Sequence, residues 1–181
     1  ETGAHILFLI YPAVGIILAT LFVKYIVRDN ISEGVTRVLY AMSRRNSRIA
    51  RHNCWTSIVG GATTIGFGGS VGPEAPIVLT GAAIGSNIGR LARLNYKHTT
   101  LLLCCGAGAA LAAIFKAPIT GVVFVLEILM LDITAGSVIP LLIASITATT
   151  MAFMLRGFDP ILAVTLAPAD AFELWQIPLF I

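Results

Sequence analysis

The chain alternates long uncharged stretches with short groups of charged and turn-forming residues. Four uncharged stretches meet or approach the ~20 residues that a bilayer-spanning helix needs, at residues 5–23, 52–73, 99–115 and 133–155. Two shorter apolar segments, residues 75–89 and 117–126, fall below that length and adjoin glycines and prolines. Short apolar segments interrupted by glycine and proline are typical of re-entrant and discontinuous membrane helices. The pattern therefore predicts an all-α, multi-pass membrane protein with broken and re-entrant helices.

Composition supports this prediction. Apolar residues make up 57% of the 181 positions and charged residues only 12%, and the mean hydropathy is +0.90, far from the balance of a soluble domain. The chain begins at Glu1 instead of a methionine, and it has no basic segment followed by a signal-peptide cleavage site. We therefore expect residues 1–181 to be one transmembrane domain fragment of a longer protein in the cell membrane.

The charges and cysteines narrow the range of partners. One polar loop carries four arginines, which the positive-inside tendency places in the cytosol: Arg44, Arg45, Arg48 and Arg51. The same loop lacks the interleaved aromatic residues of a nucleic-acid patch and is flanked by predicted spans, so we expect no nucleic-acid partner. The three cysteines show no CxxC spacing and the three histidines are scattered, which predicts neither a metal site nor a cofactor.

Hydrophobic periodicity and turn residues predict the order of the elements. A first span is followed by a short amphipathic helix that begins near Gly34, and a glycine stripe lies on a later helix, where close helix packing is its expected role. The predicted elements are a span at 5–27, a second span near 52–66, the glycine-striped helix at 75–94 with Gly81, Gly85 and Gly89, a polar turn at 90–98, a buried helix at 99–115, a break at 116–118, a helix from Pro118 to near Asp132, a span at 137–155, and a terminal loop at 158–181.

The glycine- and proline-rich stretch at residues 68–79 contains a single acid, Glu74. No charged residue occurs between Asn53 and Pro73, and the next after Glu74 is Arg90. An ionisable side chain at such a depth costs at least ~2.5 kcal/mol on insertion scales and indicates a functional site. A structural alternative is that Glu74 only caps a helix starting at Ala75 or Pro76. The residues alone leave both interpretations open.

Two predicted helix starts could hold an anion. The helix starting near Gly34, with Ser32 as its expected N-cap, and the helix starting near Ala75 each present free N–H groups and a positive dipole end. If these starts meet, the Glu74 carboxylate could occupy the positive pocket when no anion is bound, and its protonation would empty the pocket.

Glu127, a second acid within apolar sequence, lies either near an aqueous helix end or on a route for proton access.

The segment Gly72-Pro73-Glu74-Ala75-Pro76 resembles the gating motif G-[KR]-E-G-P of the CLC chloride channels and chloride/proton antiporters. Further runs are similar to that family in the same order, at residues 78–81, 85–90, 106–115 with 117–118, and 121–127. The resemblance implies an inverted-repeat architecture of which this chain is most of the first repeat. It also implies transport of chloride or a similar small anion, by a channel or a proton-coupled antiporter, in a homodimer that pairs through helices similar to 118–131 and 137–155. The second repeat, needed for a complete pore, is missing from this chain.

By this resemblance, Glu74 is the gating and proton-accepting glutamate. The backbone of its own motif, at Gly72, Ala75, Pro76 and Ile77, would cradle the outer anion. The family's G-S-G-I-P loop, which contacts the central anion, falls on Ser32-Glu33-Gly34-Val35-Thr36.

Three departures from the family pattern bear on function. Glu33 takes the place of the loop serine unless Ser32 serves instead, and an added carboxylate repels a nearby anion. Ile128 stands where many antiporters have their inner proton-transfer glutamate, so Glu127 is the nearest substitute. Pro73 and Ala75 replace a basic residue and a glycine beside Glu74.

The sequence also bears on two other classes of function. A non-conducting or divergent membrane scaffold is the alternative to transport, and measured flux would separate the two. A nucleotide-binding enzyme is disfavoured, because the glycine-rich stretch has neither GxGxxG spacing nor a following Lys-Ser/Thr. No cluster of nucleophile, base and orienting group emerges either, so no catalytic residue is predicted.

Overall fold

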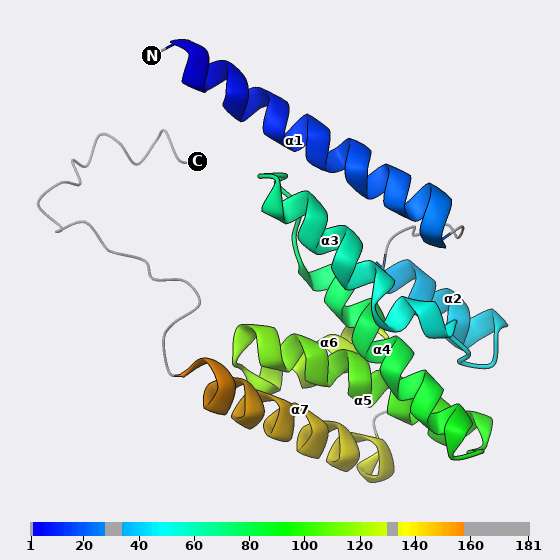
Figure 1. The fold of residues 1–181 in the computed structure, drawn as a ribbon. Helices are drawn as coiled ribbons and strands as arrows, with labels where there is room; N and C mark the ends of the chain where they lie inside the picture. The colour runs from blue at the N-terminus through cyan, green and yellow to red at the C-terminus, as the bar shows by residue number, and fades with distance from the viewer. Residues whose placement is uncertain (1, 28–33, 130–133, 158–181) are drawn as a thin grey trace, which may run out of the picture.

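A computed structural model of the chain describes residues 2–27, 34–129 and 134–157 (Figure 1). Every regular element in these three segments is helical. The elements are α1 (Thr2–Phe22), the π-helical turn η1 (Val23–Val27), α2 (Gly34–Arg44), the 3₁₀ turn η2 (Arg51–Cys54), α3 (Thr56–Gly66), α4 (Glu74–Leu91), α5 (Tyr96–Phe115), α6 (Pro118–Ile128) and α7 (Ala135–Arg156). The all-α prediction is confirmed, and the predicted tail at 158–181 lies outside the described residues.

The hydrophobic core forms around α5. This helix packs against α4, α6 and α7, whereas α1 packs against α3 at the far side of the molecule (Figure 1). Fully buried side chains at the centre include Leu79, Leu103, Val125 and Leu141, which come from α4, α5, α6 and α7. The burial of α5 confirms the expectation for residues 99–115.

Glycine contacts bring α4 and α5 into backbone contact. A Cβ atom on Gly81 would overlap the carbonyl oxygen of Gly106, and one on Gly106 would overlap that of Gly81. A Cβ on Gly85 would overlap the Leu102 carbonyl oxygen in the same way, and one on Gly89 would lie 3.1 Å from Thr99 Cγ2. The predicted packing role of the glycine stripe is therefore confirmed.

Three predicted boundaries were wrong. The span predicted near 52–66 ends at Gly66 as expected, but residues 51–54 form the 3₁₀ turn η2, so the α-helix begins only at Thr56 and has 11 residues. The chain then turns at Gly68, whose φ is +81°. The predicted turn at 90–98 shrinks to 92–95. Arg93, at φ +52°, and the bond from Leu94 N–H to the Gly89 carbonyl end α4, and Asn95 is the extended N-cap of α5. Helix α6 ends at Ile128 rather than near Asp132.

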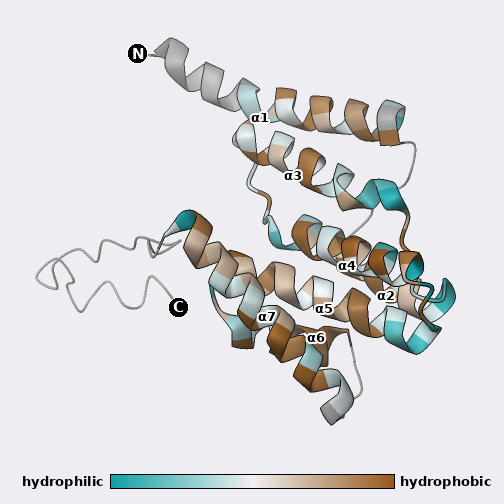
Figure 2. Ribbon diagram, turned by 60° about the horizontal axis from the view of Figure 1, so that its bottom comes forward, coloured by the Kyte–Doolittle hydropathy of each residue, from teal (hydrophilic) through white to brown (hydrophobic). Residues whose placement is uncertain are grey.

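The predicted break before α6 is confirmed. Lys116 adopts a left-handed conformation (φ 51°) at the end of α5, and Pro118 is the first residue of α6, where its missing N–H costs no helical bond. Helices α5 and α7 are each long and apolar enough to cross a bilayer, whereas α3 and α6 have only 11 residues. Hydrophilic residues gather at one end of the bundle, on the α2–η2 segment and the α4–α5 turn (Figure 2).

Candidate functional site

Glu74 is the first residue of α4, with Pro73 as the N-cap. The helix thus begins one or two residues before the expected start at Ala75 or Pro76, and Pro76 becomes the third helical residue. The Glu74 side chain is exposed and has no hydrogen-bond or ion-pair partner among the described residues. Its carboxylate turns back toward its own loop, because a Cβ on Gly72 would overlap Glu74 Oε2. The carboxylate therefore lies beside the helix start without capping it.

The start of α4 offers few free amides. A helix normally leaves its first four N–H groups without intrahelical partners. At α4 the first and fourth of these positions are Pro73 and Pro76, which have no N–H, and the Ile77 amide already donates to the Pro73 carbonyl oxygen at 3.2 Å. The two open donors are the amides of Glu74 and Ala75. They define where this end could hold an anion.

The start of α2 touches the start of α4. Gly34, the first residue of α2, is buried, and a Cβ on it would overlap the Ala75 carbonyl oxygen. Only glycine allows this approach, so the sequence-predicted helix starts near Gly34 and Ala75 are brought together. The next residue, Val35, packs against the hydrophobic core. The positive ends of two helix dipoles therefore converge beside Glu74, an arrangement that attracts negative charge.

Helix α3 closes the other side of the site. A Cβ on Gly61 would lie 3.1 Å from Pro76 Cγ, so Gly61 of α3 packs against the Pro76 ring. Ile77 is half-buried behind this contact, whereas Gly72 is exposed in the turn before α4. Ser32 and Glu33, predicted to lie next to the anion, are outside the described residues.

Glu127 is not part of this arrangement. It lies in the last turn of α6, is exposed, and belongs to a helix that packs against α5 and α7. Within the three described segments, no group of three or more His, Cys, Asp or Glu side chains could hold a metal ion.

Sequence reasoning missed a buried polar cluster at the start of α3. Asn53 is 0% exposed, and both polar atoms of its amide lack a partner among the described residues. The buried hydroxyls of Thr56 and Ser57 also lack partners there. Helix α4 approaches the cluster through Thr80, whose Oγ1 donates to the Asn53 carbonyl oxygen at 3.5 Å. The available signal was the polar run Asn53-Cys54-Trp55-Thr56-Ser57 within an uncharged stretch. Buried polar groups without partners are rare. The Asn53 amide and the Thr56 and Ser57 hydroxyls are therefore three further groups that could donate hydrogen bonds near α4.

The match to a protein family defines the class of the protein. Residues 15–181 match the family described as voltage gated chloride channel. The chain therefore belongs to the voltage gated chloride channel family, which confirms the resemblance to CLC proteins, and membership implies a membrane protein.

Individual relatives show the same relationship over parts of their length. The chain is 29% identical over 160 residues to a ClcB-like protein of Ralstonia nicotianae, covering 86% of this chain and 37% of the relative. It is 34% identical over 125 residues to the H(+)/Cl(-) exchange transporter ClcA of Vibrio cholerae, covering 67% of this chain and 26% of the relative. The ClcA of Citrobacter koseri is 42% identical over 72 residues, covering 38% of this chain and 15% of the relative. The chain thus spans between a quarter and two fifths of the first two relatives.

Proposed function

We propose that the full-length protein transports chloride or a similar small anion across the cell membrane, and that Glu74 gates the anion path. The observation that carries this proposal is the position of Glu74. Glu74, which has no side-chain partner among the described residues, begins α4 at the point where the start of α2 touches the start of α4. The family match and the relationship to a proton/chloride exchange transporter support the same function. Residues 1–181 would form part of one larger membrane domain.

The proposed mechanism is competition between a fixed and a diffusing negative charge. An ionised Glu74 carboxylate lies next to the open amides of Glu74 and Ala75, so it opposes an anion at the same donors through like-charge repulsion. Protonation removes that charge and leaves the helix ends free to attract chloride. Anion flux should therefore rise as the pH falls. In an antiporter, the proton taken up by Glu74 would be exchanged for the anion.

The test is reconstitution of the full-length protein in liposomes, with chloride efflux and proton uptake measured over a range of pH. We expect Glu74→Gln to remove the pH dependence of chloride flux and to abolish any coupled proton movement, because glutamine cannot ionise. If the chloride flux of Glu74→Gln still depends on pH, Glu74 is not the gate. An absence of flux from the unmodified protein would instead support the alternative, a non-conducting membrane scaffold.

Glu127→Gln is the matched control, since Glu127 is the other acid within the described residues. We propose Glu127 as the nearest substitute for the proton-transfer acid that Ile128 replaces. If protons pass by Glu127, its substitution should lower proton uptake while leaving the pH dependence of chloride flux intact. Equal effects of both substitutions on chloride flux would show that neither acid is a specific gate.

We further propose that the protein is a homodimer in the lipid bilayer and that a second repeat completes the anion path. The outward faces of α6 and α7 support the pairing, because large apolar side chains are exposed there, including Ile119, Val123, Ile139, Ile143 and Ile146. Light scattering from the purified full-length protein in detergent should give a protein mass of two chains. A single-chain mass would contradict the proposed dimer but would not bear on the proposed role of Glu74.

A further inference from the structure

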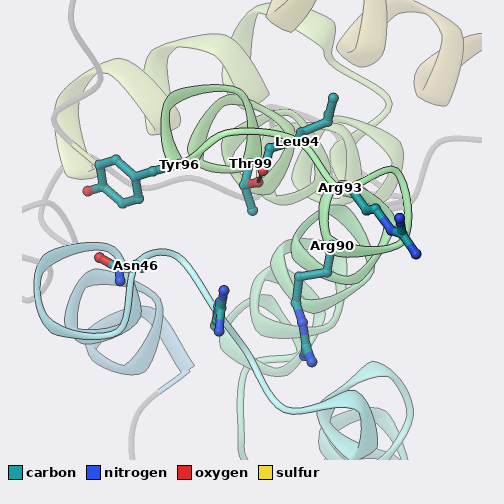
Figure 3. A pocket seen from close by; sticks show the side chains of 7 residues that line it. Asn46, Arg90, Arg93, Leu94, Tyr96 and Thr99 are labelled. Carbon is teal, nitrogen blue, oxygen red and sulfur yellow. Dashed lines mark hydrogen bonds between the residues drawn. The ribbon is translucent and has the colours of Figure 1, made fainter.

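A basic pocket lies far along α4 from Glu74, at the other end of the helix. It has a volume of about 530 Å³, within the size range of small-molecule sites. The pocket opens between the loop after α2, the end of α4 and the start of α5 (Figure 3). Its polar lining consists of Asn46, Arg48, Arg90, Arg93, Tyr96 and Thr99.

The three arginines of the pocket have no acidic partner in the part of the chain that the structure describes. The sequence has no Asp or Glu at residues 34–73 or 75–126, which include every element around the pocket. The Arg48 and Arg93 side chains have no partner within the described segments, and Arg90 makes only a long hydrogen bond of 3.4 Å to Asn87 Oδ1. A cation in the last turn of a helix interacts favourably with the helix dipole, which accounts for the position of Arg90. It does not account for Arg48 or Arg93, which lie in separate loops.

Buried hydrogen bonds fix the backbone beneath these side chains. Ser86 Oγ donates to the Ser47 carbonyl oxygen at 2.6 Å and accepts from the Ile49 amide at 3.1 Å. A further hydrogen bond, exposed to solvent, links the start of α5 to α2: the Tyr96 hydroxyl donates to the Met42 carbonyl oxygen at 2.9 Å. The loops that carry the arginines are therefore held in place while the guanidinium groups stay available. Such preorganisation reduces the entropic cost of binding a ligand.

We propose that this pocket binds the phosphate group of an anionic ligand. Guanidinium groups form paired hydrogen bonds to the oxygens of a phosphate, a geometry that a single chloride ion cannot match. Asn46, Tyr96 and Thr99 also line the cavity, and the Tyr96 and Thr99 hydroxyls already donate to the Met42 and Leu94 carbonyl oxygens. This inference concerns the end of α4 remote from Glu74, and it stands whether or not Glu74 is a gate.

The apolar residues beside the pocket favour a phospholipid headgroup over a soluble phosphate. Leu91 is 83% exposed and Leu94 is 42% exposed, and both lie at the end of α4 or in the turn that carries Arg93. An acyl chain attached to the bound phosphate would cover these side chains. Basic clusters of a membrane protein also attract the anionic lipids of the adjacent leaflet.

The test uses the full-length protein in a neutral detergent, titrated with lipid and analysed by native mass spectrometry. The probes are phosphatidylglycerol, zwitterionic phosphatidylcholine and inorganic phosphate. We expect phosphatidylglycerol to bind more tightly than phosphatidylcholine, and Arg48→Gln/Arg93→Gln to weaken it by at least about tenfold, the effect of losing a charge-assisted hydrogen bond. Phosphate binding of equal strength, dependent on the same arginines, would support the pocket and assign it to a soluble ligand.

Arg44→Gln is the control, because it removes the same charge from the end of α2 without lining the pocket. It should change phosphatidylglycerol binding by less than about twofold. Arg48→Lys, which keeps the charge but loses the planar fork, should give an intermediate loss and tests the geometry without the double substitution. The proposal is overturned if Arg44→Gln weakens binding as much as the double variant does, or if no probe binds the unmodified protein more tightly than the double variant.

Discussion

The two halves of α4 are held in opposite ways. From Gly81 onward one face of the helix packs against α5, and at Gly81 and Gly85 the backbones touch so closely that a Cβ would overlap a carbonyl oxygen of α5. The first turn, which carries Glu74, touches α2 through Gly34 but leaves the carboxylate exposed and without a partner in the described part of the chain. Close packing of one half of a helix can thus fix the position of its start while an acid at that start remains available for chemistry.

The largest expected effect comes from disturbing the packed half. Gly85→Ala should lower the free energy of unfolding of the full-length protein by more than about 2 kcal/mol, because the new Cβ overlaps the Leu102 carbonyl and forces the backbones apart. Reversible unfolding in detergent measures this change. Gly60→Ala is the matched control, since nothing lies within 4 Å of its added Cβ, and it should be neutral or stabilising by up to about 1 kcal/mol. Similar losses in the two variants would mean that the glycine contacts do not set the packing.

A smaller effect, on chloride affinity, is expected where the start of α2 meets the first turn of α4. Gly34→Ala should push the two helix starts apart, because its Cβ would overlap the Ala75 carbonyl oxygen. Loss of about 1 kcal/mol of helix-end stabilisation corresponds to a roughly fivefold weaker chloride affinity, measurable by titration calorimetry on the full-length protein. Gly66→Ala adds its Cβ into open space and should leave the affinity unchanged. An unaltered affinity in Gly34→Ala would exclude the α2 start from the anion site.

The smallest effect tests whether hydroxyl bonds add to the glycine contacts. Thr149 is buried on α7, and its Oγ1 lies 3.2 Å from the Ala112 carbonyl oxygen of α5 and 2.8 Å from that of Ser145. Thr149→Val should cost about 0.6 kcal/mol of unfolding free energy, the average for such interhelical polar contacts in membranes. The exposed Thr150 bonds only within its own helix, to Ile146, so Thr150→Val should change stability less. A larger loss in Thr150→Val would refute the interhelical role.

The packing of α4 from Gly81 onward was predictable from the sequence, whereas the surroundings of its first turn at Glu74 were predictable only in part. Glycines four residues apart predict one contact face whatever lies opposite, so Gly81, Gly85 and Gly89 sufficed to anticipate close packing. The length of α3 was not predictable, because an uncharged stretch does not distinguish a span from a short helix followed by a loop. The position of the α4–α5 turn was missed for a related reason, since residues such as Arg90 and Lys97 suit both helix ends and loops.

The candidate site was likewise predictable only in part. Glu74 was identifiable because it is the only charge between Asn53 and Arg90. Its surroundings depend on contacts between residues that are distant in the sequence, such as Gly34 with Ala75. The buried Asn53 amide was overlooked because polar residues near a predicted span end normally face water.

The prolines on either side of Glu74 and Ala75 bear on how quickly an ion could pass. Any other residue at position 76 would bring a further N–H group to this end of α4, and a deeper well for a negative ion with it. Conduction requires that an ion leave as readily as it arrives. If an anion binds at this helix start as proposed, the donors that Pro73 and Pro76 withhold would make its binding weaker and its release faster.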